Sequence, residues 1–212
     1  MTETLDLNKK ALRPDKLAEL AIQDEKILQA LLQGITPEAQ KANVRENSSK
    51  VLIFLAENQP EVLLPYWTNF IKLLKSENGF SKYVAIHVIT LLVQIDKKGL
   101  FEKVFDVYYG LLDDESVMVA SHLAGTSGKI AKAKPALQPK ITQCLLAVDK
   151  THFNASRQAL IKSYIIEAFS EYFEESEDKA MMIAFVKQQV DCESPKTRRA
   201  AKVFLQKWEG IE

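Results

Sequence analysis

The chain has 212 residues, of which 47% are apolar, and this is enough to build a hydrophobic core of ordinary size. Its 28 Lys and Arg residues equal its 28 Asp and Glu residues, so no net charge draws the molecule toward nucleic acid or an anionic membrane. Only 7 Gly and 7 Pro, with abundant Leu, Ala, Lys and Glu, predict an all-α protein rather than a strand-rich or disordered one.

Cysteine usage and hydropathy narrow the class of protein further. Cys144 and Cys192 stand apart from each other and from any histidine cluster, which predicts neither a zinc site nor a disulfide framework. The N-terminus lacks an apolar run of signal-peptide length, so a cytoplasmic protein is expected. The longest nearly uncharged run, residues 83–95, is shorter than the roughly 20 residues that span a bilayer, and it is interpreted as a buried helix.

The first third of the chain predicts a tail followed by two helices. Residues 1–13 lack apolar periodicity and are predicted to form an N-terminal tail. Pro14 suits a first helical turn, and apolar residues then recur at three- and four-residue spacing as far as Gly34, which predicts one helix. The sequence Thr36-Pro37-Glu38 is expected to open a second helix that runs to about Glu57.

Turn residues divide the middle of the chain into two further helical pairs. Pro60 begins an apolar helix, and a second helix is expected over residues 81–95. The apolar run at residues 99–112 is expected to form the next leading helix. Its partner is the stretch of small residues that follows Asp114 and ends at Ala133.

The last third of the chain completes the set of hairpins. Pro135 starts one helix, and Asn154 is expected to cap another that runs through Phe173. Residues 177–190 then pair with a final helix over residues 195–208. Ten helices in five hairpins are therefore predicted.

The second helices of these hairpins repeat one another. Their central positions are predicted to be equivalent and buried, at intervals of about 38 residues, which is the period of HEAT and armadillo arrays. These positions are Ser48, Ala85, Leu123, Ala159 and Ala201.

Two of the second helices carry a pattern that resembles HEAT repeats, in which a Val-Arg pair is followed by an Ala and then a Leu. They read Val44-Arg45-x-x-Ser48 with Leu52, and Thr197-Arg198-x-x-Ala201 with Leu205. The resemblance implies an all-α, right-handed α-α superhelix of about five HEAT-like helical hairpins, in a single domain over residues 14–209. The repeats would cover residues 14–57, 60–95, 98–133, 135–173 and 177–209.

The resemblance also implies a concave groove lined by the second helices. The position after the repeat arginine, and the position four residues later, would then face the groove. Along the array, the residues at these positions are of mixed charge in the first repeats and basic in the last ones, which favours an acidic segment of a protein partner. The alternative is a solvated polar face without a ligand. The candidate partner-binding residues are Tyr83, His87, Ser121, Arg157, Arg199 and Lys202.

Several other patterns are interpreted as structural. The basic residues Arg45, Lys82 and Arg198 recur at one repeat position. The HEAT resemblance implies that they bond to the turns and acids of neighbouring repeats, and a basic ladder for an acidic ligand is the alternative. The segment that contains Gly125 and Gly128 lacks the Gly-Lys-Ser/Thr ending of a phosphate loop. The two glycines therefore predict the close approach of a neighbouring helix.

Two charged clusters, one basic and one acidic, are interpreted as solvated loops, with a bipolar edge for docking or self-association as the alternative. They comprise Lys129, Lys132, Lys134 and Lys140, and then Glu171, Glu174, Glu175, Glu177 and Asp178.

The expected function is that of a non-catalytic protein-binding adaptor or scaffold, without cofactor, metal or membrane. His87, His122 and His152 share no metal-ligand spacing, and no Ser/His/Asp or Cys/His catalytic grouping is evident. The alternative is a nucleic-acid-binding protein resembling the HEAT-like alkylpurine DNA glycosylases, which the balanced charge disfavours. A third possibility is a HEAT module resembling bilin lyases, but the chain has no cysteine or cofactor motif that supports it. The oligomeric state is left open.

Overall fold

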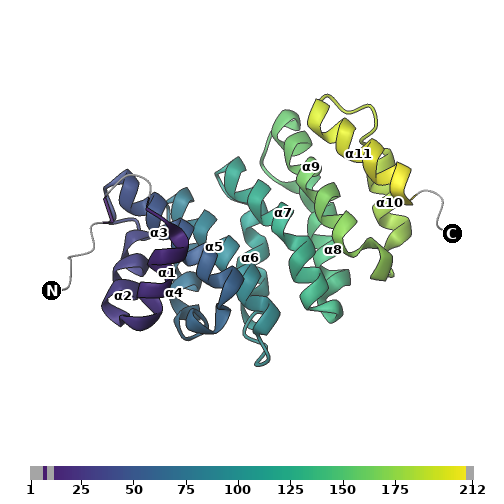
Figure 1. Ribbon diagram of the computed structural model, residues 1–212. Helices are drawn as coiled ribbons and strands as arrows, with labels where there is room; N and C mark the ends of the chain where they lie inside the picture. The colour runs from purple at the N-terminus through teal and green to yellow at the C-terminus, as the bar shows by residue number, and fades with distance from the viewer. Residues whose placement is uncertain (1–6, 9–11, 209–212) are drawn as a thin grey trace. The chain divides into compact units, whose positions relative to one another are not determined.

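The protein is all-α, as its composition predicts. The computed structural model describes residues 7–8 and 12–208, and within these residues it contains eleven α-helices, eight short 3-10 helices and no strand (Figure 1). The chain divides into two compact units, Met1–Lys98 and Gly99–Glu212. The single domain over residues 14–209 stays a prediction, and residue 209 lies outside the described part of the chain.

Five α-helices and three 3-10 helices form the first unit. The longest of them, α3, packs against α1, α2 and α5, while α4 packs against α5. The α-helices are α1 (Pro14–Gln23), α2 (Glu25–Gly34), α3 (Ala42–Asn58), α4 (Trp67–Leu74) and α5 (Gly79–Leu92). The 3-10 helices are η1 (Pro60–Val62), η2 (Leu64–Tyr66) and η3 (Val93–Ile95).

The prediction of one helix from Pro14 to Gly34 is wrong, because the chain breaks at Asp24. This residue takes an extended backbone conformation with φ −130° and ψ 107°. Its side chain accepts a hydrogen bond of 2.8 Å from the backbone nitrogen of Lys26 and so caps α2. A favourable N-cap therefore outweighs the continuous apolar periodicity.

The start of the second predicted helix is also wrong, since α3 begins at Ala42 instead of Thr36. The Thr36 hydroxyl donates to the carbonyl oxygen of Gln33 at 3.0 Å, and the backbone nitrogen of Ala39 donates to the carbonyl oxygen of Thr36. Thr36 thus closes the end of α2 and begins a turn, so it does not cap a new helix.

The core of the first unit is built around α5, and the prediction of a buried helix here is confirmed. The Ser81 hydroxyl donates to the carbonyl oxygen of Ile35 at 2.8 Å and so fastens the start of α5 to the end of α2. Trp67 on α4 is buried as expected. The buried apolar residues of α5 are Val84, Ala85, Ile86, Val88, Ile89 and Leu92.

Of the predicted N-terminal tail, Leu7, Asn8 and residues 12–13 fall within the described part of the chain. Leu7 is buried, and its carbonyl oxygen accepts a hydrogen bond of 2.8 Å from the Asn47 side chain. The remaining tail residues, 1–6 and 9–11, lie outside the described residues.

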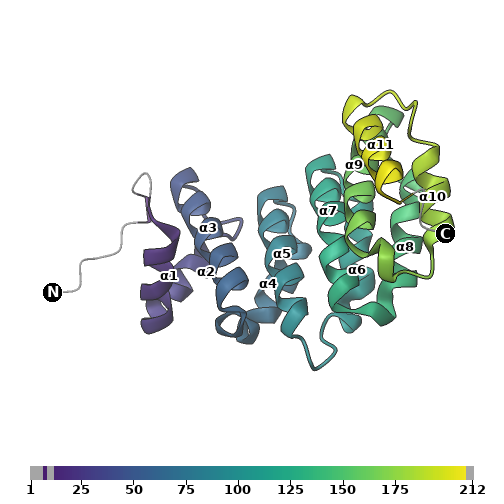
Figure 2. The same cartoon turned by 45° about the vertical axis from the view of Figure 1, so that its right-hand side comes forward.

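The second unit contains three long helices, α7, α9 and α11, and α9 packs against both of the others (Figure 2). The Asn154 side chain accepts from the backbone nitrogen of Arg157 at 3.0 Å, which confirms the predicted cap of α9. The α-helices are α6 (Phe105–Tyr109), α7 (Val117–Ala133), α8 (Gln138–Leu146), α9 (Ala155–Tyr172), α10 (Lys179–Lys187) and α11 (Pro195–Trp208). The 3-10 helices are η4 (Glu102–Val104), η5 (Gly110–Asp113), η6 (Pro135–Leu137), η7 (Ala147–Lys150) and η8 (Phe173–Glu175).

The contact between α7 and α9 depends on two glycines of α7. A Cβ atom at Gly128 would lie 2.6 Å from the carbonyl oxygen of Ala168, and a Cβ at Gly125 would lie 3.2 Å from the ring of Tyr164. Neither position can take a side chain without movement of α9 or of the Tyr164 ring. The predicted close approach of a neighbouring helix is confirmed.

The positions predicted to be equivalent are buried in four second helices and only half-buried in α9. Ser48, Ala85, Leu123 and Ala201 are buried, whereas Ala159 is partly exposed. The carbonyl oxygen of Ala159 instead accepts a hydrogen bond of 2.5 Å from the buried Thr197 hydroxyl of α11. Trp208, predicted to be core, is also buried.

Among the described helices, none combines the length and the apolarity that crossing a membrane requires.

Candidate functional site

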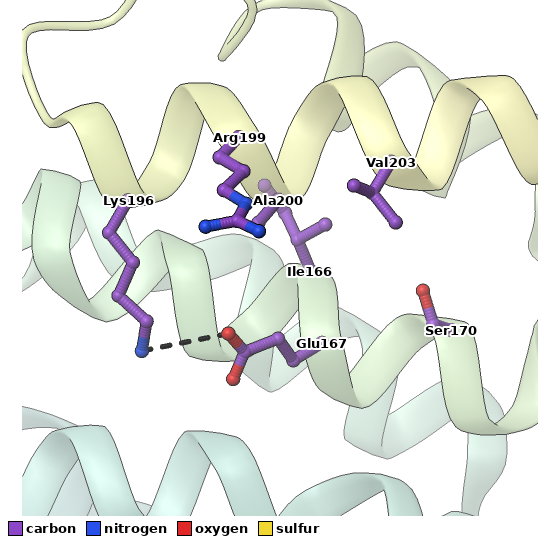
Figure 3. A pocket seen from close by; sticks show the side chains of 7 residues that line it. All are labelled: Ile166, Glu167, Ser170, Lys196, Arg199, Ala200 and Val203. Carbon is purple, nitrogen blue, oxygen red and sulfur yellow. Dashed lines mark ion pairs between the residues drawn. The ribbon is translucent and has the colours of Figure 1, made fainter.

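An open pocket with a volume of about 450 Å³ lies between α9 and α11 in the second unit (Figure 3). On α11 its lining residues are at positions 196, 199, 200 and 203, which is the spacing of one face of a helix. The lining residues are Ile166, Glu167 and Ser170 of α9, and Lys196, Arg199, Ala200 and Val203 of α11.

Aliphatic side chains from both helices supply the apolar part of the pocket. Ile166 is buried and Ala200 is half-buried, whereas Val203 is 58% exposed. No other large apolar side chain in the described part of the chain is as exposed as Val203. The pocket therefore offers apolar surface that a binding partner could remove from water.

Lys196 reaches from α11 to the surface of α9. Its Nζ lies 3.2 Å from the centroid of the Tyr164 ring and 3.6 Å from Oε1 of Glu167, the pair that is dashed in Figure 3. Burial, and secondly the Lys196 charge, lower the pKa of His122 on α7. The positive charge of Lys196 and the negative charge of Glu167 thus largely compensate each other.

Arg199 is the cation of the pocket that is not compensated. Its side chain extends from α11 toward the pocket, beside Ala200 (Figure 3). Within residues 7–8 and 12–208 no hydrogen bond or ion pair of the guanidinium is present, although it lines the same pocket as Glu167. The pocket therefore carries one positive charge in excess, next to exposed aliphatic surface.

Three of the six residues predicted from the sequence are exposed cations of the second unit. Arg199 lines the pocket, whereas Lys202 is exposed on the same helix and does not line it. Arg157 is exposed in the first turn of α9, where its backbone nitrogen bonds to Asn154. The binding role of all three stays a prediction.

The other three predicted residues are partly or fully covered. Ser121 on α7 is 4% exposed, and its hydroxyl has no hydrogen-bond partner in the described part of the chain, so it is not on the open surface. Tyr83 and His87 are half-buried on α5 of the first unit, with ring centroids 4.6 Å apart. Their role as partner-binding residues also stays a prediction.

The sequence pattern missed the contribution of α9 to the pocket. The repeat register predicts no role for Ile166, Glu167 and Ser170, because in this helix it assigns the groove position to Arg157, near the start. The useful signal was the spacing of Tyr164 and Glu167, three residues apart, which places an aromatic ring and a carboxylate on the same side of α9.

Arg198 and Arg45, which both occupy the recurring basic position, make structural contacts. The Arg198 guanidinium donates to the carbonyl oxygens of Cys192 at 2.7 Å and Glu193 at 3.0 Å. The Arg45 guanidinium lies 5.9 Å from the centroid of the Phe80 ring. These contacts support the structural interpretation for both arginines.

Lysines of the basic cluster form ion pairs within the second unit. Lys134 pairs with Glu102 at 3.1 Å, and Lys140 pairs with Asp106 at 2.8 Å. Burial raises the pKa of Glu171, and the nearby charges of Lys129 and Lys132 oppose this rise. These contacts are consistent with solvated, internally compensated loops.

Two further groups in the second unit carry side chains of types that occur in reactive sites, an Asp–His pair and a free thiol. The carboxylate of Asp113 accepts from the backbone nitrogen of His152 at 2.7 Å, and the same oxygen lies 2.6 Å from Nδ1 of the imidazole. Burial raises the pKa of the Cys144 thiol, which disfavours the reactive thiolate. Among the described residues no group of three or more His, Cys, Asp or Glu side chains is arranged to hold a metal ion.

Comparisons with protein-family models, with curated proteins and with solved structures find no match to this chain. The HEAT resemblance therefore rests on the sequence pattern.

Proposed function

We propose that the protein is a non-catalytic adaptor or scaffold that binds a segment of another protein on the α9–α11 face of the second unit. The observation that carries this proposal is the pocket between the two helices. It combines the exposed aliphatic side chain of Val203 with the uncompensated guanidinium of Arg199. Apolar contact surface with an arginine beside it is typical of protein-binding surfaces.

The architecture proposed to support this face is a right-handed superhelix of about five HEAT-like hairpins. In the first unit, the hairpin helices α2 and α4 pack on α3 and α5, and α3 packs on α5. In the second unit α9 packs on α7 and α11, while α8 packs on α7 and α10 packs on α11. Within each unit, the packing of one second helix on the next is the arrangement that helical repeat arrays use, and it supports the proposal.

The proposal is tested by affinity purification with the wild-type chain and with Arg199→Glu as bait, from extracts of the source cells. We expect a set of proteins that the wild type retains and that Arg199→Glu loses. Lys97→Glu provides a control, since Lys97 is exposed in the first unit and the substitution makes the same change of charge. Lys202→Glu shows whether the pocket alone or the whole basic surface of α11 is used.

Identical partner sets for wild type and Arg199→Glu would remove this face from the proposed function. Recovery of nucleic acid that depends on Arg199, with no protein retained, would favour the nucleic-acid alternative instead. Circular dichroism of each variant checks that the helices remain folded, which is expected because Arg199, Lys97 and Lys202 are all exposed.

A further inference from the structure

The chemistry of the pocket between α9 and α11 narrows the kind of segment that can occupy it. Val203 presents exposed aliphatic surface, and buried Ile166 lies at the pocket beside it. Removing such surface from water is favourable only if the partner brings an apolar side chain to it. The first requirement is therefore an aliphatic side chain on the partner.

The charges of the pocket set the second requirement. Glu167 is already paired with Lys196 at 3.6 Å, so the guanidinium of Arg199 leaves one positive charge in excess. A carboxylate can accept two parallel hydrogen bonds from a guanidinium, whereas a cationic side chain would be repelled. The partner must therefore bring one Asp or Glu side chain to Arg199.

The spacing of Arg199 and Val203 sets the third requirement. The two residues are four positions apart on α11, which corresponds to a rise of about 6 Å along the helix axis. Both side chains lie on the side of α11 that faces the pocket (Figure 3). The aliphatic and acidic side chains of the partner must be about one helical turn apart and on one face.

The backbone of the partner must be satisfied by its own hydrogen bonds. The pocket is formed by residues 166–170 of α9 and 196–203 of α11, and most backbone groups of these segments are bonded within the helices. An extended segment laid in this groove would find few partners for its own N–H and C=O groups, and each buried group without a partner is costly. A helix brings its backbone already bonded and can lie in such a groove.

We infer that the occupant of the pocket is an amphipathic helix of a partner protein, which places an aliphatic side chain on Val203 and an Asp or Glu carboxylate, one turn away, on Arg199. The inference rests on the proposed function and adds the chemistry of the bound segment.

The test selects helical peptides against the purified protein. The probe is a phage-displayed library of amphipathic helical peptides that are randomised at the apolar and adjacent positions of one face. Against the wild type, we expect enriched sequences with Leu, Ile or Val three or four positions from Asp or Glu. Against Arg199→Glu, the same library should return Lys or Arg in place of the acid, because the charge of the site has been reversed.

Affinities of one enriched peptide complete the test. By fluorescence anisotropy, Arg199→Glu should weaken its binding at least about tenfold, whereas Lys202→Glu should change it less than about twofold. A peptide with Lys in place of its acid should recover binding to Arg199→Glu. Enrichment without an acid, or equal affinity for wild type and Arg199→Glu, would overturn the inference.

The two proposals fail in different ways. If purified partners depend on Arg199 but the library returns peptides that are extended or lack the acid, the protein-binding face stands and the helix inference is wrong. If neither the partners nor the peptides depend on Arg199, both proposals are wrong.

Discussion

Replacing Gly128 by alanine should loosen the packing of α7 on α9. The new Cβ would lie 2.6 Å from the carbonyl oxygen of Ala168 and 2.8 Å from Cβ of Glu171, whereas ordinary contacts begin at 3.4 Å. Because the first of these atoms belongs to the backbone, it cannot move away by a change of rotamer. The two helices must therefore separate by about 0.8 Å at this point, in a region that is otherwise close-packed.

The expected cost of Gly128→Ala follows from two opposing effects. Forcing an extra carbon into a packed interface costs about 1–3 kcal/mol. Alanine is favoured over glycine inside a helix by about 1 kcal/mol, and this offsets part of the cost. Because the closest atom belongs to the backbone, the upper half of the packing cost applies, and we expect a net loss of about 1–2 kcal/mol in the free energy of unfolding. This corresponds to a fall in Tm of about 2–8 °C for a chain of this size.

The assay is urea and thermal unfolding followed by circular dichroism, with Gly110→Ala as a matched control. A Cβ at Gly110 would meet no heavy atom within 4 Å, so the control should be as stable as wild type or slightly more stable. Gly125→Ala should fall between the two, because its nearest neighbour is a Tyr164 side chain that can shift. Unchanged or increased stability of Gly128→Ala would refute the described approach of α7 and α9.

Three further predictions concern single contacts of the second unit. Asp113→Asn should lower stability slightly at neutral pH, because hydrogen bonds from His152 hold the pKa of Asp113 below its usual value. The contribution of the ionised carboxylate to stability is present above about pH 4, and it is lost as the pH falls through the lowered pKa. Urea unfolding of both proteins at pH 7 and pH 3 measures this, and a difference that is undiminished at pH 3 would contradict it. Lys196→Met should raise the pKa of His122, since the Lys196 charge contributes to its lowering; an NMR titration of the imidazole that shows no rise counts against this contact. Thr197→Val should cost about 1–3 kcal/mol in unfolding experiments, because the Ala159 carbonyl loses its buried hydroxyl donor; wild-type stability would show that this bond does not fasten α11 to α9.

Features set by local chemistry could be predicted from the sequence. The cap at Asn154, the buried α5 and the close approach at Gly125 and Gly128 depend on neighbouring residues or on one missing side chain. The break at Asp24 has a local cause too, but its N-cap signal competed with an unbroken apolar period on both sides. The rule that a strong N-cap residue can divide a periodic segment would have found it.

The composition of the pocket could be predicted only in part. Arg199 was found because it follows the repeat arginine on α11, a relation within one helix. Its neighbours Ile166 and Glu167 come from α9, and their position depends on how that helix is rotated against α11. Contacts such as Thr197 with Ala159 fix this rotation, and they join residues far apart in the sequence.

Photo-crosslinking from position 203 tests the protein-binding face most directly. A benzophenone amino acid placed at Val203 would stand at the most exposed large apolar position of the described residues, beside Arg199. On irradiation in extracts of the source cells, we expect a discrete product with one partner, absent when the same amino acid replaces Lys97 and absent when Arg199→Glu is present in the same chain. Equal yields from positions 203 and 97, or a yield at 203 that is indifferent to Arg199→Glu, would contradict the proposed binding of a protein segment at the α9–α11 pocket.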